Sequence, residues 1–182
     1  MKISRAILLA AATRSMPKRY FPWQFGISYD EIGRGSGQNL FDEQLDVRDL
    51  LRRQSTVSWV IVSTVMFISF LFEPSFGLVS ASRDSVTALG SWDNALTVTA
   101  PEDIGKITAR LALLHPNVKG VVYTAGDTVT FRRLVDIVER VTGREVTRKL
   151  KTVDQLETEL AEGTNDGMRK YRVVRCPVLQ SR

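Results

Sequence analysis

Along the chain, segments with apolar residues at helical spacing alternate with short, nearly continuous apolar runs, and together they predict an α/β fold. Apolar residues recur at helical spacing over residues 41–54, with acids early and arginines late, as in an amphipathic helix. Residues 57–64 then form a nearly continuous apolar run, typical of a parallel strand covered on both faces. A helix at 3–12 and a short strand at 18–21, ending at Pro22, precede them. The order helix, strand, helix, strand is that of a parallel α/β sheet.

The second half continues with shorter elements. Residues 72–90 are irregular and predict a short hairpin. A helix is predicted from Pro101, which suits a first helical position, to about Leu114. The other predicted elements are strands at 96–99, 118–125 and 145–150, a helix at 130–142 that ends at Gly143, and a helix at 153–161. From residue 162 onward the pattern loosens, and residues 176–182 show no packing pattern.

The composition is that of an ordinary globular domain. The chain has 182 residues, of which 43% are hydrophobic and 25% charged, so it can form a core without disulfides or a metal. Cys176 is the single cysteine, which suits a reducing compartment, and we expect a cytoplasmic location. His115 is the single histidine, so soft ligands are too few for a usual zinc site and no metal is predicted.

The net charge of +5 leaves several classes of anionic partner open. Basic residues are mostly interleaved with acids and no nucleic-acid motif occurs, so direct binding of nucleic acid is not expected. Residues 1–12 reach the lower limit of a secretory signal, which stays an alternative to the helix. The apolar stretch 57–72 is shorter than the roughly 20 residues that span a bilayer, so a buried strand is favoured over a membrane helix.

Several apparent motifs lack the context that their chemistry needs. The glycine cluster at 33–37 does not lie between a strand and its helix as a G-x-G-x-x-G turn would, and G-K-[ST] is absent, which favours an ordinary loop. No Tyr-x-x-x-Lys pair exists, so the commonest short-chain dehydrogenase mechanism is excluded for this chain. Glu102 and Asp103 are interpreted as the acidic first turn of a helix rather than as paired catalytic carboxylates.

Four segments together carry a family resemblance. They are KRYFPWQFGISYD from Lys18, FDEQLDVRDLL from Phe41, VIVST from Val60 and APEDIG from Ala100. In this order and spacing they resemble the NmrA-like and isoflavone reductase-like family of NADP-dependent, atypical short-chain reductases, in its fungal branch. The similarity runs from about residue 18 to about residue 174.

This resemblance implies a fold and a domain organisation. Residues 1–64 would be the remnant of an NAD(P)-binding Rossmann domain, a partial Rossmann-like parallel sheet whose N-terminal strands are missing. Residues 65–174 would form a small α+β substrate-binding part, and residues 175–182 a disordered tail. The glycine-rich turn that binds the cofactor pyrophosphate in the family would then be absent from this chain.

The resemblance also places catalytic and cofactor positions on the helix at 41–54. The family's acid–base lysine falls on Gln44, whose amide cannot take or give a proton near neutral pH. One turn later, Arg48 matches an arginine that contacts NADP in the family. The alternative for Arg48 is a solvated helix arginine paired with Asp42 or Asp49.

Two further segments match the family's ligand-binding loops. Pro22, Gln24 and Phe25 fall in a loop at the carboxyl end of a strand, where the cofactor ring lies; for Phe25, and for its neighbour Trp23, an ordinary place in the core or rim is the alternative. The second segment contains Thr64, Met66 and Phe67, and the resemblance implies that these residues border the substrate pocket. Val65 stands among them where a glycine is expected, so an altered turn is predicted.

The activity that the resemblance implies is hydride transfer from NADPH to a small, aromatic organic substrate. Without the pyrophosphate-binding turn and the lysine, we expect weak or absent NADP binding and impaired turnover in this chain. The alternative is a non-catalytic module that senses NAD(P) and binds a partner such as a transcription regulator. The sequence leaves both open.

Overall fold

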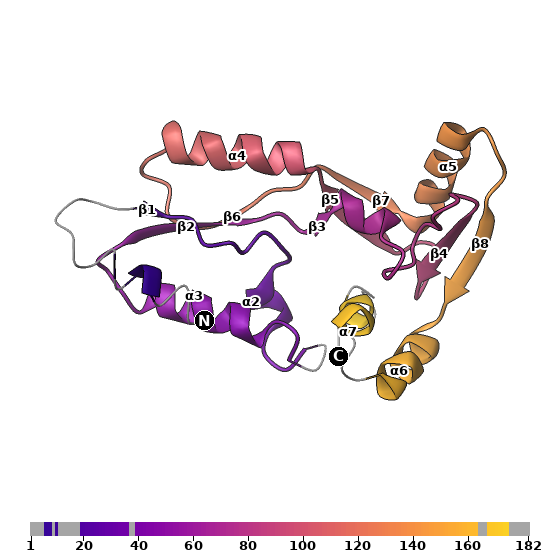
Figure 1. The fold of residues 1–182 in the computed structure, drawn as a ribbon, viewed down its shortest axis with the longest axis horizontal. Coiled ribbons are helices and arrows are strands. Elements are labelled where there is room, and N and C mark those ends of the chain that lie inside the picture. Colours follow the sequence, from indigo (N-terminus) through magenta and orange to yellow (C-terminus); the bar gives the residue numbers. More distant parts are fainter. Residues whose placement is uncertain (1–5, 9, 11–18, 37–38, 164–166, 175–182) are drawn as a thin grey trace.

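A parallel three-stranded sheet forms one region of the molecule. The computed structural model describes residues 6–8, 10, 19–36, 39–163 and 167–174. The strand order is β1 (Arg19–Tyr20), β2 (Ser58–Ser63) and β6 (Gly120–Tyr123), and both pairings are parallel. Helices α2 (Tyr29–Ile32) and α3 (Asp42–Arg52) lie on one face, and α4 (Pro101–Leu113) on the other (Figure 1).

The central strand β2 shows why this sheet is sandwiched between helices. Val60 and Val62 pack into one cluster with Leu111 of α4. Ile61, which points to the opposite face, packs with Leu51 of α3. Both faces of β2 are therefore buried, which explains why its sequence is continuously apolar instead of alternating.

A second region contains the remaining strands. A sheet of order β3-β5-β7 comprises β3 (Met66–Phe67), β5 (Ala95–Thr99) and β7 (Asp127–Thr130). Strand β4 (Ser85–Leu89) pairs in parallel with β8 (Thr147–Lys151). The short helix η1 (Ile68–Phe72) follows β3, and α5 (Phe131–Thr142) and α6 (Val153–Glu162) complete the region. One hydrophobic cluster fills it, with Phe76 and Phe131 fully buried.

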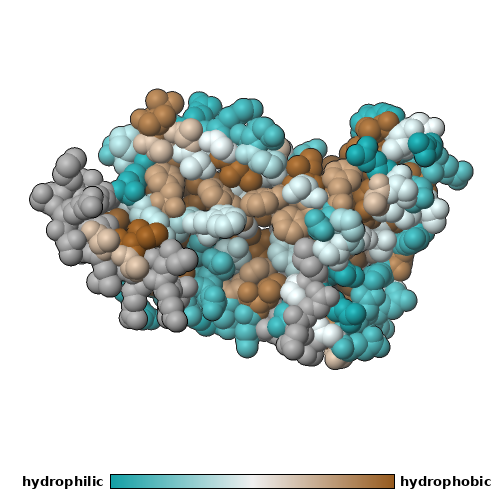
Figure 2. Space-filling model, in the orientation of Figure 1, coloured by the Kyte–Doolittle hydropathy of each residue, from teal (hydrophilic) through white to brown (hydrophobic). Residues whose placement is uncertain are grey.

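Helix α7 (Gly167–Val174) lies between the two regions (Figure 1). Its Tyr171 packs against the core of the second region and also against the cluster of α2 and α3 that contains Tyr29, Phe41 and Leu45. Apolar side chains gather along the middle of the face in Figure 2, flanked by hydrophilic ones. The C-terminal helix therefore connects two parts of the chain that are far apart in sequence.

The structure confirms the predicted α/β class and its parallel sheet. The helices predicted at 41–54, 101–114, 130–142 and 153–161 are all present, with Gly143 ending α5 in a left-handed conformation at φ 66°. The predicted hairpin exists as an antiparallel bridge between Val79 and Val86, but its second arm is also strand β4 of a parallel pair.

Five elements were not predicted, namely α2, β3, η1, β7 and α7. Strand β7 is short and half exposed, and α7 lies where the pattern loosens. Residues 6–8 and 10 are helical, whereas the rest of the predicted helix at 3–12 and the tail at 175–182 lie outside the described residues. The apolar stretch 57–72 contains β2, β3 and η1. Within the part of the chain that the structure describes, no helix has the length and apolar character needed to cross a bilayer.

Candidate functional site

The loop after β1 is attached to helix α3 by one buried amide. Gln24 is 2% exposed, and its Nε2 donates to the backbone oxygen of Gln44 at 2.8 Å. Its Oε1 accepts a hydrogen bond from Nε of Arg48 at 3.0 Å. Both ends of the amide are therefore used, and the loop has a fixed position beside α3.

A buried arginine continues this connection. Arg48 is 0% exposed, its Nη1 donates to Asp30 at 2.6 Å, and its guanidinium lies 4.9 Å from the centre of the Tyr29 ring. Arg52 donates to both carboxylate oxygens of Asp30, at 2.8 and 2.7 Å. The hydrogen bond from Arg52 is the largest cause that holds the pKa of Asp30 below its usual value, helped by Arg48 and opposed by burial.

This geometry corrects one prediction for Arg48. The side chain is neither solvated nor paired with Asp42 or Asp49; it pairs with Asp30 because it lies on the buried face of α3. Its Nη2 is buried and has no partner among the described residues. As it stands, the side chain presents no exposed donor to a cofactor phosphate.

The turn after β2 is tied to the same loop. Ser63 Oγ donates to the backbone oxygens of Gly26 and Ile27, at 2.9 and 3.1 Å, and the N–H of Val65 donates to Gly26 at 2.9 Å. Val65 has φ 62°, a left-handed conformation that is costly for a β-branched residue. At the position where a glycine was expected, the valine therefore has a backbone conformation that glycine adopts without this cost.

These two segments border a pocket of about 290 Å³ at the carboxyl edge of the parallel sheet. It is lined by Trp23, Gln24, Phe25, Gly26, Ile27, Tyr29, Gln44, Val65, Phe67, Phe70 and Tyr171. Nothing in the described structure hydrogen-bonds the side-chain amide of Gln44. Since ligands of open α/β sheets bind at the carboxyl ends of the strands, this pocket is the candidate site.

Four of the predicted site residues line this pocket, namely Gln24, Phe25, Gln44 and Phe67. Pro22 is buried outside the lining. Thr64 and Met66 do not line this pocket either. Thr64 is fully buried and its backbone oxygen accepts from Thr99, while Met66 lies in the core of the second region. Successive residues of a strand point to opposite faces, so Phe67 reaches the pocket and Met66 does not.

Four lining residues were missed by sequence reasoning: Ile27, Tyr29, Phe70 and Tyr171. Tyr29 lies within one of the quoted segments, but its role depends on contacts with α3. Phe70 and Tyr171 come from η1 and α7, about 100 residues apart in sequence. No local signal brings these two rings together, because only tertiary packing does so.

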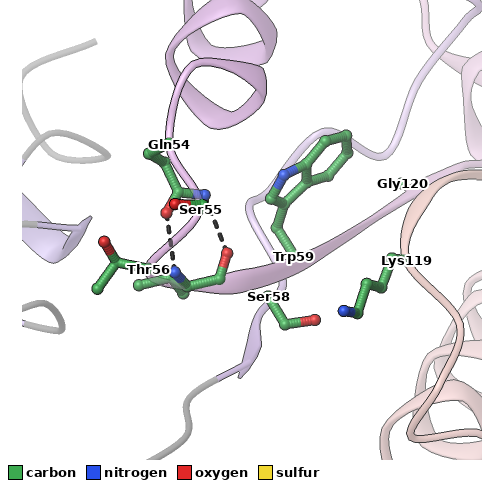
Figure 3. A pocket seen from close by; sticks show the side chains of 8 residues that line it. Gln54, Ser55, Thr56, Ser58, Trp59, Lys119 and Gly120 are labelled. Atoms are coloured by element: carbon green, nitrogen blue, oxygen red, sulfur yellow. Dashed lines mark hydrogen bonds between the residues drawn. The ribbon is translucent and has the colours of Figure 1, made fainter.

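A second hollow, of about 590 Å³, lies at the opposite edge of the sheet (Figure 3). Trp59, Ser58 and Lys119 line it near the amino ends of β2 and β6. The side chain of Gln54 supports its rim by bonding both the N–H and the carbonyl of Val57, at 2.8 and 2.9 Å. Its position at the amino edge does not match the place where α/β sheets bind cofactors.

Sequence comparison relates the chain to a known family. The sequence pattern of the NmrA-like family matches residues 2–170. The chain belongs to the NmrA-like family. A relative from Gibberella moniliformis, described as an NmrA-like family domain-containing oxidoreductase, is 44% identical over 148 residues, which are 80% of this chain and 49% of the relative. The NmrA-like chain thus spans about half the length of this curated relative.

Solved structures show the same fold at low sequence identity. An isoflavone reductase superposes with a TM-score of 0.74 at 16% identity, over 91% of this chain and 56% of that one. The complex of leucoanthocyanidin reductase with NADPH from Vitis vinifera gives 0.78 at 19% identity, over 94% and 57%. The NmrA-like chain therefore has the Rossmann-like fold of isoflavone reductase-type proteins.

Proposed function

We propose that this NmrA-like chain carries the substrate-pocket portion of an NADP(H)-dependent oxidoreductase whose substrate is a small aromatic molecule. The observation that carries the proposal is the convergence of Gln24, Phe25, Gln44 and Phe67, from separate segments, on one pocket at the carboxyl edge of the sheet. The oxidoreductase relative and the NADPH complex of a similar fold support this assignment.

The pocket suits an aromatic ring better than a phosphate. Aromatic side chains, among them Phe25, Phe67 and Phe70, supply most of its wall. None of the lining residues that the structure describes is cationic. The nearby cations are engaged, because Arg48 and Arg52 both bind Asp30. Phosphates bind to cationic forks and helix N-termini, so the lining of this pocket does not fit the phosphate end of NADP.

We therefore assign Arg48 a positioning role. Its guanidinium holds Gln24 and Asp30, and Gln24 in turn bonds the backbone of Gln44. Through these contacts Arg48 fixes the loop that forms one wall of the pocket. Gln44 would present its amide to a polar group of a bound ligand but could not move a proton, because an amide does not titrate near neutral pH.

The first test is a titration of NADPH fluorescence with the full chain. We expect no saturable binding at micromolar concentrations. Saturation in that range would contradict the proposal that these residues lack the phosphate site.

The second test concerns the proton. In a version extended to include a glycine-rich dinucleotide turn, Gln44→Lys should raise NADPH-dependent reduction of an aromatic substrate by about 100-fold, the lower end of the usual contribution of general acid–base catalysis. Gln44→Arg is the matched control, since it adds the same charge but its pKa is too high for proton exchange. An equal gain with arginine would attribute the effect to charge alone.

The alternative function is a non-catalytic NAD(P)-sensing module, with a transcription regulator as its partner. The observation that favours it is Gln44 itself, which keeps a polar group in the pocket without an acid or base. No gain from Gln44→Lys in the extended protein would favour this alternative.

A further inference from the structure

We propose that Tyr171 is a specificity-determining residue, which closes one side of the pocket and selects flat aromatic ligands. The inference rests on the proposed function, because it assigns a wall to the same pocket. Tyr171 comes from α7, which none of the four quoted family segments includes.

Rings from two elements and from the segment after η1 hold Tyr171 in a defined orientation. Phe70 of η1 stacks on it, with ring centres 5.9 Å apart and an interplanar angle of 15°. Phe41, at the start of α3, meets it edge to face at 5.9 Å and 76°, and Phe76 does so at 5.4 Å and 66°. Offset-stacked and edge-to-face pairs are the preferred arrangements of aromatic rings. The orientation of this wall is therefore set before a ligand arrives.

Polar contacts of α7 fix the backbone that carries the ring. Arg169 Nη1 donates to the backbone oxygen of Glu159 at 2.7 Å. Arg172 bonds the Glu159 carboxylate at 3.3 Å and the backbone oxygen of Ser75 at 3.1 Å. Gly163 allows this close approach, since a Cβ there would lie 2.7 Å from Nη1 of Arg169. Helix α7 is thus attached both to α6 and to the segment after η1.

The lining defines the chemical class of the ligand. Phe25, Phe67, Phe70 and Tyr171 offer ring faces and edges, and Gln44 offers an amide with no partner among the described residues. A volume of about 290 Å³ lies at the lower end of small-molecule pockets, which begin at roughly 300 Å³. The matching ligand is a single substituted aromatic ring with a carbonyl or hydroxyl group that can bond Gln44.

The test is calorimetric binding of two probes of similar size to the full chain without cofactor. 4-Hydroxybenzaldehyde has an aromatic ring, and cyclohexanecarbaldehyde has a saturated one. We expect the wild-type chain to prefer the aromatic probe. Tyr171→Ala should weaken aromatic binding by about tenfold, the upper value for one ring pair, with little change for the saturated probe. Tyr171→Phe should retain the preference.

Phe76→Leu is the matched control, because Phe76 contacts Tyr171 but does not line the pocket. It should change aromatic binding less than Tyr171→Ala does. Equal losses in both variants, unchanged binding in Tyr171→Ala, or binding of neither probe by the wild-type chain would each overturn the inference. Should Tyr171→Ala not fold, Tyr171→Leu replaces it: leucine keeps an apolar side chain but no ring, so aromatic binding should weaken about tenfold. Unchanged binding in that variant would also overturn the inference.

Because no cofactor enters this measurement, its outcome is separate from that of the NADPH titration. Failure of the probes to bind would leave the predicted absence of the phosphate site standing. Tight NADPH binding would contradict the proposed function without changing the role of Tyr171 in probe binding.

Discussion

The two walls of the pocket are held by different forces. The wall from Trp23 to Tyr29 depends on Gln24, Asp30 and Arg48, which are connected by hydrogen bonds from the Arg48 guanidinium; Gln24 also bonds the backbone of Gln44. The opposite wall depends on ring packing of Tyr171 against Phe70 and its neighbours. Polar and ionic contacts hold the first wall in place, and apolar ring contacts hold the second, although both walls border the same cavity of about 290 Å³.

This difference determines how each wall responds to change. A buried charge is strongly destabilising once its partner is lost, because the remaining ion stays desolvated. An aromatic cluster loses stability by degrees, in proportion to the contacts removed. The polar wall should therefore be sensitive to single substitutions and to pH, and the aromatic wall to side-chain shape.

The largest effect is expected from Asp30→Asn. It removes the charge that pairs with fully buried Arg48, so the free energy of unfolding should fall by about 3–5 kcal/mol in urea denaturation. Asp46→Asn is the matched control, since its ion pair with Arg34 is exposed and should contribute about 1 kcal/mol or less. If Asp30→Asn lowered the free energy of unfolding no more than Asp46→Asn does, the claim that a buried ion pair holds the polar wall would be contradicted.

Acid should act on the polar wall. The pKa of Asp30 is lowered in the folded chain, so its contribution to stability is fully present above the unfolded value, near 3.9. It is lost as pH falls from there through the lowered folded pKa. The free energy of unfolding of the wild-type chain should fall more steeply below about pH 4 than that of Asp30→Asn. Phe76→Leu, which changes the aromatic wall, should keep the wild-type slope. Parallel curves for the wild-type chain and Asp30→Asn would contradict this account.

The smallest effect concerns the strained turn that joins the walls. At an ordinary position glycine is less stable than alanine by about 0.5–1 kcal/mol. Val65 has φ 62°, where a Cβ costs roughly 1–2 kcal/mol. Val65→Gly should therefore be more stable than Val65→Ala by about 1 kcal/mol in thermal or urea unfolding. If Val65→Ala were instead more stable than Val65→Gly, as at an ordinary position, the turn would carry no strain.

The sequence predicted the parts of the site that depend on local pattern. Continuous apolarity identified β2, and helical spacing identified α3. Arg48 could have been placed correctly as well, because it lies seven residues after Phe41 and three after Leu45, on the same buried face of the helix. Its pairing with Asp30 spans 18 residues of loop and helix, and no local pattern encodes it.

The elements that escaped prediction are defined by tertiary contacts. Strand β7 is a short polar segment that becomes a strand by pairing with β5, where Thr128 and Thr97 share a side-chain hydrogen bond of 2.9 Å. Helix α7 combines a glycine with several basic residues, and its place depends on Glu159 and on the rings around Tyr171. These contacts join residues that are distant in sequence, so propensity alone could not reveal them.

The central claim is that the two walls enclose a site for an aromatic ligand at the carboxyl edge of the sheet. The most direct measurement is a nitrogen-15 NMR titration of the full chain with 4-hydroxybenzaldehyde. The account predicts that the signals of the Trp23 indole, the Gln44 amide and the Tyr171 backbone shift together with one saturation curve. Shifts gathered instead at Trp59 and Lys119, which line the hollow at the amino edge, would contradict it.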